Sequence, residues 1–582
     1  MPHPHPPMAH PFHDETLLFT PAIAEATAIP LVFAFPNSYS VGITSLGYQV
    51  VWAKLASRPD LEVARLFLDA AEPLDRAPEL LGFSLSWELD YANILTLLER
   101  LQIPIHSRDR GDSDPIIFGG GPVLTGNPEP FADFFDVILL GDGEVVLDAF
   151  IDAYRPVQGR SRDEVLLTLG QVPGLYVPAL YQVTYQDGDG PIAAIAPTHG
   201  SIPATVKKQT YRGNQLSAST VVTPHAAWEN IFMVETVRSC PELCRFCLAS
   251  YLTLPFRTPD LETSLLPAIA RGLAVTDRLG LLGASVTQHP EFDALLDELT
   301  RPTYDGVRVS IASVRAATVT EKLARVLSQR ETRSLTIAIE SGSERLRQIV
   351  NKKLDQEDIV GAAVNAQAGG LKGLKLYGMA GVPGETEADL EATADLLVAL
   401  KKAAPRLRLT FGCSTFVPKS HTPFQWYGVD PAAEKRLKFL RKRLVPKGIE
   451  FRPESYSWSV VQALISRGDR RLGALLTAVR EYGLGDTDNP DRVSLGSYRR
   501  AFKDLRGTLP PLEHYVHRPW SAAEILPWHH LEGPLPLETL DKHRQAAIAL
   551  GATPLPGEER QSPENSPTDE PTGPEPRPVA VP

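Results

Sequence analysis

Three of the four cysteines in this 582-residue chain lie within eight residues, in the run Cys240-Pro-Glu-Leu-Cys244-Arg-Phe-Cys247. An extended, strand-like segment, residues 231–237, leads directly into this run. Three thiolates on one short loop can face a common point, which is the arrangement of a soft-metal site. This arrangement favours a fold in which the end of a strand presents the loop to a metal centre.

The number and spacing of the cysteines distinguish between the metal centres that such a loop could hold. A structural zinc ion needs four protein ligands, and no second pair of cysteine or histidine ligands follows at short range. A [4Fe–4S] cluster that only carries electrons also has four thiolate ligands, whereas three leave one iron open for a substrate or cofactor. We predict that Cys240, Cys244 and Cys247 hold such a cluster. A zinc ion completed by a distant histidine, or three unconnected thiols, are the alternatives.

Residues 228–455 alternate strand-like and helix-like segments, a pattern typical of parallel strands joined by helices. Within the strand-like segments, apolar residues alternate with polar or small ones, so the two faces of the sheet differ. We predict a partial (β/α) barrel with an apolar face under the helices and a polar face around a ligand cavity. A solvent-exposed antiparallel sheet is the alternative. The expected strands lie near residues 281–287, 307–313, 334–340, 371–377 and 407–415.

The alternation also assigns faces to two residues outside the cysteine run. Glu340 falls on the polar face at the C-terminal end of its strand, where barrel enzymes carry their chemistry. Cys413 is in phase with Leu407, Leu409 and Phe411, on the apolar face. We therefore expect Cys413 to be a buried packing residue rather than a ligand.

The spacing Cys-x3-Cys-x2-Cys, with Phe246 before the last cysteine, resembles that of the radical S-adenosylmethionine (SAM) superfamily. The resemblance implies that SAM chelates the open iron through its amino and carboxylate groups. It also implies that a reductant such as ferredoxin or flavodoxin supplies one electron, which cleaves SAM and releases a 5′-deoxyadenosyl radical that abstracts hydrogen from the substrate. The cofactors carry this chemistry, and the protein binds, orients and excludes water.

Three further segments resemble the SAM-contacting elements of that superfamily. The run Ile339–Arg345, followed by Asn351–Lys353, is similar to the fourth-strand element and implies contacts from Glu340 and Ser341. The run Tyr377–Thr386 is similar to the fifth-strand turn, which implies that Gly381 lets the backbone approach the adenine. Leu282–Ser285 stands where many members have Gly-Gly-Glu, so Gly283 and Ser285 are the expected substitutes. The sequence identifies no catalytic residue.

Residues 28–155 form a second α/β pattern, which we interpret as a doubly wound, Rossmann-like domain. Two glycine-rich turns, residues 119–122 and 141–144, follow expected strand ends, where such sheets bind ligands. The region resembles the cobalamin-binding domain fused to many radical SAM enzymes. The resemblance implies cobalamin contacts from Gly119, Gly120, Gly121, Gly141, Asp142, Gly143 and Glu144. The motif Asp-x-His-x-x-Gly is missing, so the domain either binds cobalamin without a histidine ligand or has lost it.

The remaining segments complete the expected organisation. We predict a disordered leader over residues 1–27, a linker with a small β region over 156–227 and a helical region over 456–550. A disordered tail rich in proline and acidic residues is expected over 551–582. The run Ser466–Arg471 resembles a segment in one branch of the superfamily; its paired arginines and aspartate could bind an anionic substrate or form a structural ion pair.

Composition excludes several classes of function. The 58 basic and 70 acidic residues give a net charge of −12, which argues against nucleic-acid binding. No apolar run is long enough for a membrane helix, and four cysteines are too few for a disulfide scaffold, so we expect a cytoplasmic protein. The favoured function is a radical SAM enzyme, with or without cobalamin-dependent methyl transfer or cyclisation, acting on an unknown substrate. The alternatives are a methylthiotransferase-like enzyme that modifies RNA or protein, and a non-catalytic metal-binding scaffold.

Overall fold

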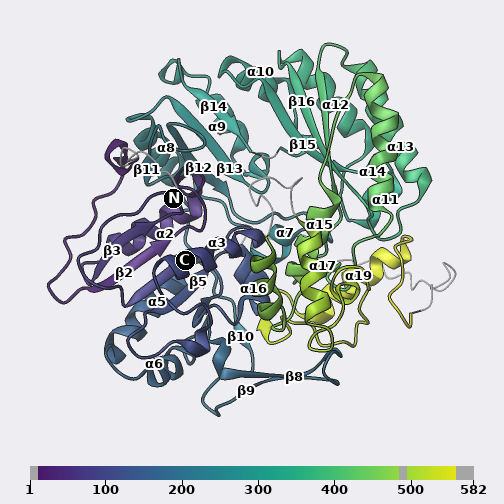
Figure 1. The fold of residues 1–582 in the computed structure, drawn as a ribbon. Coiled ribbons are helices and arrows are strands. Elements are labelled where there is room, and N and C mark those ends of the chain that lie inside the picture. Colours follow the sequence, from purple (N-terminus) through teal and green to yellow (C-terminus); the bar gives the residue numbers. More distant parts are fainter. Residues whose placement is uncertain (1–10, 313, 484–493, 559–582) are drawn as a thin grey trace, which may run out of the picture.

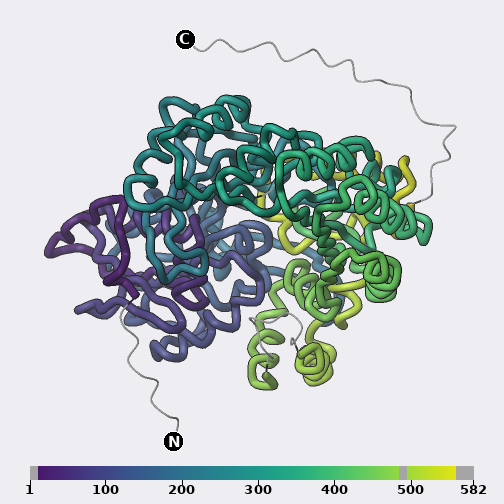
Figure 2. The backbone as a smooth tube through the Cα atoms, turned by 90° about the horizontal axis from the view of Figure 1, so that it is seen from above, coloured from purple at the N-terminus to yellow at the C-terminus, as the bar shows by residue number. Residues whose placement is uncertain are grey.

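The computed structural model describes residues 11–312, 314–483 and 494–558. Its elements form an N-terminal α/β domain, a barrel-like second α/β unit and a helical C-terminal region (Figure 1). Figure 2 shows the purple and blue N-terminal domain on one side of the molecule and the teal and green barrel segments as a layer along the other. Within the described residues, no helix combines the length and the apolarity that crossing a membrane requires.

The N-terminal domain is a doubly wound sheet, as predicted. Its strand order is β3-β2-β4-β5-β6-β7, with the first five strands parallel and β7 antiparallel at the edge. The strands are β2 (Ile29–Ala34), β3 (Leu61–Leu66), β4 (Leu80–Ser84), β5 (Ile116–Gly120), β6 (Val137–Leu139) and β7 (Leu175–Tyr176). The helices are α1 (Tyr39–Thr44), α2 (Leu46–Ala56), α3 (Tyr91–Arg100), α4 (Pro122–Gly126), α5 (Gly143–Tyr154) and α6 (Arg162–Leu169). The order reverses at β2, which pairs with both β3 and β4, and ligands bind such sheets at this switch point.

The second unit contains seven parallel strands in two sheets, of order β12-β13-β14 and β15-β16-β17-β18. An isolated parallel bridge between Val314 and Ile337 joins the two sheets, so the strands follow one another around a partial barrel. The strands are β12 (Ile231–Val237), β13 (Arg278–Gly283), β14 (Arg308–Ile311), β15 (Ser334–Glu340), β16 (Gly373–Ala380), β17 (Arg408–Thr415) and β18 (Glu450–Pro453). The helices are α7 (Leu248–Leu252), α8 (Leu266–Leu273), α9 (Phe292–Glu298), α10 (Glu321–Gln329), α11 (Glu344–Ile349), α12 (Gln356–Ala368), α13 (Glu387–Ala403) and α14 (Ala433–Leu444).

The two faces of this sheet differ as the alternation predicts. Leu374 and Leu376 of β16 are fully buried against the helices, whereas the adjacent Tyr377 is 51% exposed on the other face. Cys413 is 2% exposed and belongs to the same apolar core as Phe411, which confirms its packing role. Because every ladder in the unit is parallel, the antiparallel alternative is wrong. The strand expected near 281–287 lies earlier, at Arg278–Gly283, where the chain pairs with β12 on one side and β14 on the other.

The C-terminal region is helical and packs against the N-terminal domain as well as the barrel (Figure 1). Its helices are α15 (Tyr456–Arg467), α16 (Leu472–Tyr482), α17 (Leu495–Asp504), α18 (Leu512–Val516) and α19 (Leu537–Ala549). Its short strand β19 (Leu531–Glu532) pairs with β10 (Val206–Lys207) of the connecting segment. That segment also contains β8 (Tyr181–Tyr185), β9 (Ile192–Pro197) and β11 (Val221–Val222).

Parts of both ends for which disorder is predicted are ordered, within residues 11–27 and 551–558. In the leader, β1 (Thr16–Leu17) pairs with β11, and the Glu15 carboxylate accepts hydrogen bonds of 2.8 Å from the buried Arg65 guanidinium. In the tail, Leu555 is buried and Glu558 forms a 2.6 Å ion pair with Arg544. A prediction from the average composition of a segment does not detect single residues that anchor it to the folded protein. Residues 1–10 and 559–582 of these predictions lie outside the described part of the chain.

Two of the three arginines of the run Ser466–Arg471 form structural ion pairs, and the third binds backbone carbonyls. Arg471 pairs with Asp469 at 2.6 Å, and Arg470 pairs with the buried Glu129 of the N-terminal domain at 3.1 Å. Arg467 is fully buried and donates to the backbone carbonyls of Tyr515, Val516 and Arg518. These guanidinium groups join the C-terminal region to the N-terminal domain and to itself, which supports the structural interpretation of the run over anion binding.

Candidate functional site

The three clustered cysteines lie at the C-terminal end of β12. The residues from Ser239 to Phe256 form one excursion, which we call the cluster loop; it carries all three thiols and α7. Ser239 and Leu243 adopt left-handed backbone conformations, with φ of 72° and 52°, which fold the loop tightly. The Cys247 amide donates to the Cys244 carbonyl at 2.9 Å, so these two residues share one turn.

The cysteines are shielded from water to different degrees. Cys244 is buried, and Cys240 and Cys247 are partly buried. Burial raises the pKa of the Cys244 thiol to about 12, against the opposing effect of nearby Lys352, and it also raises the pKa of Cys247. A thiol with a raised pKa becomes a ligand when a metal displaces its proton.

The donor set fits a cluster better than a single metal ion. Among the residues that the structure describes, no three histidine, cysteine or acidic side chains are grouped as they would be around one ion. A [4Fe–4S] cluster does not need that grouping, because each thiolate binds a different iron. Three soft, shielded thiols on one loop match this requirement.

The residues expected to contact SAM lie at the carboxyl ends of β13, β15 and β16. Glu340 ends β15 with a left-handed φ of 62°, and its carboxylate accepts a 2.9 Å hydrogen bond from Lys352. Ser285 donates a 2.5 Å hydrogen bond to Gln288, which also lies 3.9 Å from the Cys240 sulfur. Glu340 and Ser285 are therefore linked toward the cluster loop by Lys352 and Gln288. Lys352 belongs to the run Asn351–Lys353 singled out in the sequence, whereas Gln288 lies outside every predicted element.

Three other expected SAM contacts have structural partners of their own. Gly283 has a φ of 152°, and a Cβ there would stand 2.8 Å from the Val237 carbonyl oxygen. The Ser341 hydroxyl is buried 3.1 Å from that of Thr393 on α13. The Gly381 amide donates a 2.6 Å hydrogen bond to Glu385, whose burial raises its pKa to about 7. The folding of the strand ends accounts for these residues, and their contacts with SAM stay predictions.

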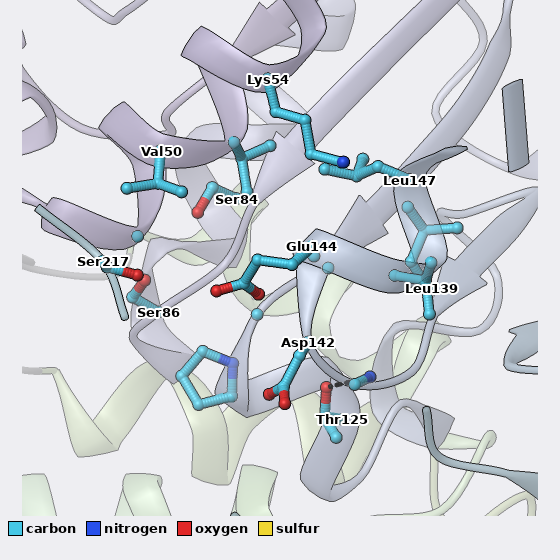
Figure 3. A pocket seen from close by; sticks show the side chains of 18 of the residues that line it. Val50, Lys54, Ser84, Ser86, Thr125, Leu139, Asp142, Glu144, Leu147 and Ser217 are labelled. Atoms are coloured by element: carbon cyan, nitrogen blue, oxygen red, sulfur yellow. Dashed lines mark hydrogen bonds between the residues drawn. The ribbon is translucent and has the colours of Figure 1, made fainter. Parts of the chain in front are cut away.

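A cavity of about 330 Å³ opens at the carboxyl edge of the N-terminal sheet (Figure 3). Its far wall comes from the barrel unit: Glu235 of β12, Arg238, and Leu252 and Thr253 at the end of α7. The cavity therefore lies against the cluster loop. Six of the seven residues predicted to contact cobalamin line it, namely Gly120, Gly121, Gly141, Asp142, Gly143 and Glu144. Gly119 is not among the wall residues; a Cβ there would meet Phe135 and Leu124 in the core.

The two tightest glycine turns at the cavity are required by the protein backbone itself. Gly121 has a φ of 114°, and a Cβ there would stand 2.5 Å from the Leu85 carbonyl oxygen. Gly141 has a φ of 122°, and a Cβ there would stand 2.0 Å from the Gln209 carbonyl oxygen. Only glycine tolerates such a backbone with so close a neighbour. These two glycines shape the cavity edge, but the need for glycine at these positions gives no information about the ligand.

Two ion pairs at the cavity join the two units. Arg238 contacts Glu144 at 2.8 Å and Glu235 at 2.7 Å, while Arg257 contacts Asp142 at 2.7 Å. Although burial alone would raise it, Lys208, Arg257 and Arg238 hold the pKa of Asp142 below its usual range. The sequence predicted Asp142 and Glu144 but not their arginine partners, because the pairs join residues about a hundred positions apart.

The rest of the cavity wall is largely apolar. Val50, Leu139 and Leu147 face the space in Figure 3, and Phe33 and Val51 complete this side. None of the wall residues that the structure describes is a histidine, cysteine or methionine. The wall thus offers an apolar surface, a few hydroxyl groups and equal numbers of basic and acidic side chains, which suits a ligand without net charge.

Comparison with known proteins gives matches to two family models. "Radical SAM proteins, N-terminal" matches residues 47–178, and "Radical SAM superfamily" matches residues 234–397. The chain is 29% identical over 460 residues to uncharacterized protein MJ0966 of Methanocaldococcus jannaschii, an alignment that covers 76% of this chain and 89% of that relative.

Two solved structures are similar at lower identity. The radical SAM methyltransferase TsrM of Kitasatospora setae, with cobalamin and a [4Fe–4S] cluster bound, is 15% identical with a TM-score of 0.48, covering 69% of this chain and 77% of that one. The cobalamin-dependent SAM radical enzyme OxsB is 11% identical with a TM-score of 0.44, covering 89% and 79%.

The two family models agree with the structure. The first covers most of the doubly wound sheet, and the second begins in β12 and includes the cluster loop and the strand ends around it. Because both models describe parts of one superfamily and together match just over half of the residues, the chain belongs to the radical SAM superfamily.

Proposed function

We propose that this protein is a cytoplasmic radical SAM enzyme that uses the N-terminal cavity to hold cobalamin beside its cluster. Membership of the superfamily implies a [4Fe–4S] cluster and SAM. When bound, these cofactors supply the reductive cleavage of SAM and a 5′-deoxyadenosyl radical for hydrogen abstraction. Cys240, Cys244 and Cys247 would hold the cluster, and a reductant such as ferredoxin or flavodoxin would deliver the electron.

One observation carries the proposal: the cavity and the cluster loop share a wall. Leu252 and Thr253, which line the cavity, end the helix that begins directly after Cys247. Only the short helix α7 thus separates the cavity wall from Cys247 in the sequence. For an enzyme that generates a radical at the cluster, this places a second cofactor or a substrate where the reaction occurs.

The chain's own residues provide shielding and orientation. Cys244 is buried, Glu340 and Lys352 form an ion pair at the strand end next to it, and Gln288 lies between Cys240 and Ser285. A closed, water-poor site protects a reactive intermediate from side reactions. We propose that Gly283, Ser285, Glu340, Ser341 and Gly381 contact SAM, since they lie at the strand ends on the side of the cysteines.

The cluster assignment is tested by anaerobic reconstitution with iron and sulfide. We expect the wild type to hold about four irons per chain and to release 5′-deoxyadenosine from SAM with dithionite. Cys244→Ala should lose the cluster and the product. Cys413→Ala is the matched control: its thiol is buried in the barrel core, so it should keep both. A Cys244→Ala protein that binds iron as the wild type does would refute the assignment.

The cobalamin assignment has chemical support in the cavity wall. The corrin ring is a broad, largely apolar surface edged by neutral amides, which matches a largely apolar wall whose basic and acidic side chains are equal in number. No wall residue that the structure describes could donate an imidazole to cobalt. We therefore propose that cobalamin binds without a protein ligand to the metal and supports methyl transfer or cyclisation of an unidentified substrate.

The visible spectrum of aquacobalamin tests this assignment. We expect saturable binding to the full-length protein and a spectrum without the features of histidine ligation. Val50→Trp, which places an indole in the cavity at a partly buried position, should abolish binding while thermal unfolding of the protein changes little. Binding that survives this substitution would place cobalamin elsewhere, and no binding would leave the cavity to the substrate.

The number of clusters separates this proposal from the methylthiotransferase alternative. Those enzymes generally hold a second cluster with three more cysteines. The whole chain has four cysteines, and the fourth, Cys413, is buried in the barrel core. We expect about one cluster per chain on reconstitution; a value near two would favour the alternative.

A further inference from the structure

Two arginines close the base of the cluster loop. The backbones of Arg238 and Arg257 exchange N–H···O hydrogen bonds of 2.9 and 3.0 Å, one in each direction. All three cysteines lie between these residues in the sequence. The loop is therefore closed at its base by this pair, while Asn351 holds its tip through hydrogen bonds of 3.0 and 2.9 Å to the carbonyls of Glu242 and Leu243. The pair of arginines fixes where the chain enters and leaves the loop that carries the thiols.

The side chains of both arginines are held by the N-terminal domain. Arg257 donates to Asp142 at 2.7 Å, and Arg238 donates to Glu144 at 2.8 Å. Glu235 of β12 supports Arg238 from within the barrel at 2.7 Å. Asp142 occupies the N-cap position of α5 and Glu144 lies in its first turn, so the start of one helix of the N-terminal domain presents both carboxylates.

These ion pairs are shielded from solvent. The side chains of Arg238, Arg257 and Asp142 are 13%, 9% and 11% exposed, and that of Glu144 is 22% exposed. Charge pairs at such depth are far less screened than pairs on the surface. Loss of Asp142 would leave the largely buried Arg257 side chain without an ion-pair partner among the described residues, which costs much more than the loss of a surface pair. Without Glu144, Arg238 would keep Glu235 of the barrel but lose its ion pair to the first turn of α5.

The same carboxylates face the cavity. Figure 3 shows the side chains of Asp142 and Glu144 projecting into the space from the start of α5. A ligand in the cavity would therefore contact the groups that hold the cluster loop. The base of the loop is held by side chains from a different domain, and these side chains line the cavity.

We propose that Asp142 and Glu144 are positioning residues for the cluster loop: through Arg257 and Arg238 they set the geometry in which Cys240, Cys244 and Cys247 bind the cluster. This inference rests on the proposed cluster function. It assigns to the N-terminal domain a role in SAM cleavage that is separate from cobalamin binding. Both carboxylates act on the thiols through the arginines.

Hydrogen exchange of the full-length protein without cofactors tests the anchoring directly. In Glu144→Gln, amides of residues 239–256 should exchange at least about tenfold faster than in the wild type, because the anchor is weakened locally. Asp148→Asn is the matched control: Asp148 lies on the same helix and pairs with Lys54, which also lines the cavity, but not with the loop. It should leave loop exchange unchanged.

The reconstituted protein gives a second, spectroscopic readout. Glu144→Gln should retain about four irons per chain but show an altered electron paramagnetic resonance spectrum of the reduced cluster with SAM. Release of 5′-deoxyadenosine should fall about tenfold, as expected when reacting groups are misplaced. Asp148→Asn should match the wild type in both measurements.

The outcomes distinguish this inference from the proposed function. If the wild type holds no cluster, the proposed function fails, whatever the exchange data show. If the wild type holds a cluster and both Glu144→Gln and Asp142→Asn match it in loop exchange and in the cluster spectrum, the positioning role is wrong. Should Glu144→Gln not fold, Glu144→Asp retains the charge but withdraws the carboxylate, and the same two readouts apply.

Discussion

The cluster loop and the N-terminal cavity both lie at the carboxyl ends of parallel strands, but their sequences signal them in different ways. The loop is marked by three thiols, side chains with a specific chemistry at a specific spacing. The cavity is marked by two glycine-rich turns. The structure explains the tightest of these glycines by neighbouring carbonyl groups at Leu85 and Gln209 rather than by a ligand.

The difference shows what a motif can report. Cysteine spacing describes the ligand, because a thiolate set selects its metal. Glycine describes the backbone, because its advantage is conformational. At the cavity, the informative residues are Asp142 and Glu144 with their arginine partners, and these pairs form only when two domains meet. Glycine-to-alanine variants can distinguish glycines that the backbone conformation requires from glycines that a ligand requires.

The largest effect is expected for Gly141→Ala. Its Cβ would stand 2.0 Å from a backbone oxygen at a φ of 122°, so both clash and strain oppose it. We expect a loss of about 3 kcal/mol or more in the free energy of unfolding. Gly159→Ala is the control, because Gly159 has a φ of 75° with no atom near its Cβ position, and strain alone should cost about 1 kcal/mol. Urea unfolding of both variants measures the difference; equal losses would contradict the role of Gln209.

A smaller, pH-dependent effect is expected at the Gly381 turn of the barrel. Burial raises the pKa of Glu385 from 4.5 to about 7. The folded protein therefore holds this proton more tightly than the unfolded chain, so the stabilisation is present below the unfolded pKa and is lost as the pH rises through 7. From about pH 5.5 to about pH 8, the wild type should lose about 2 kcal/mol relative to Glu385→Gln.

Thermal or urea unfolding of both proteins across this pH range measures the difference. Glu385→Gln cannot ionise at this position, and its amide oxygen can still accept the Gly381 N–H. The paired comparison cancels the titration of other groups. A stability difference that stays constant with pH would show that Glu385 is ionised throughout.

Much of the fold follows from the sequence pattern. The alternation in β15, β16 and β17 located those strands and both faces, and it placed Cys413 in the core, where the structure has it. The order of strands in the doubly wound sheet was not predicted, since pairing is a long-range property. The composition of the leader predicts disorder, but β1 pairs with β11, a segment about two hundred residues away. The composition of one segment contains no information about such a distant partner.

The candidate site was predicted less completely. Spacing located the thiols, and resemblance located the strand ends, but Gln288, Lys352, Arg238 and Arg257 gained their roles only from the tertiary contacts. The paired arginines of Ser466–Arg471 left two interpretations open. Their partners, Glu129 and the carbonyls near residue 516, lie in other parts of the chain and support the structural one.

The smallest effect on stability, and the sharpest test of the comparison, is expected for Gly120→Ala. Gly120 lines the cavity, and a Cβ there would meet ordinary contacts of 3.7 and 3.8 Å at Leu139. The free energy of unfolding should change by less than about 1 kcal/mol. If a ligand packs against this backbone, the added methyl group should still weaken aquacobalamin binding, measured by visible titration. A destabilisation as large as that of Gly141→Ala would mean that all the glycines of these turns serve the backbone; an unchanged affinity would mean that the ligand does not reach Gly120.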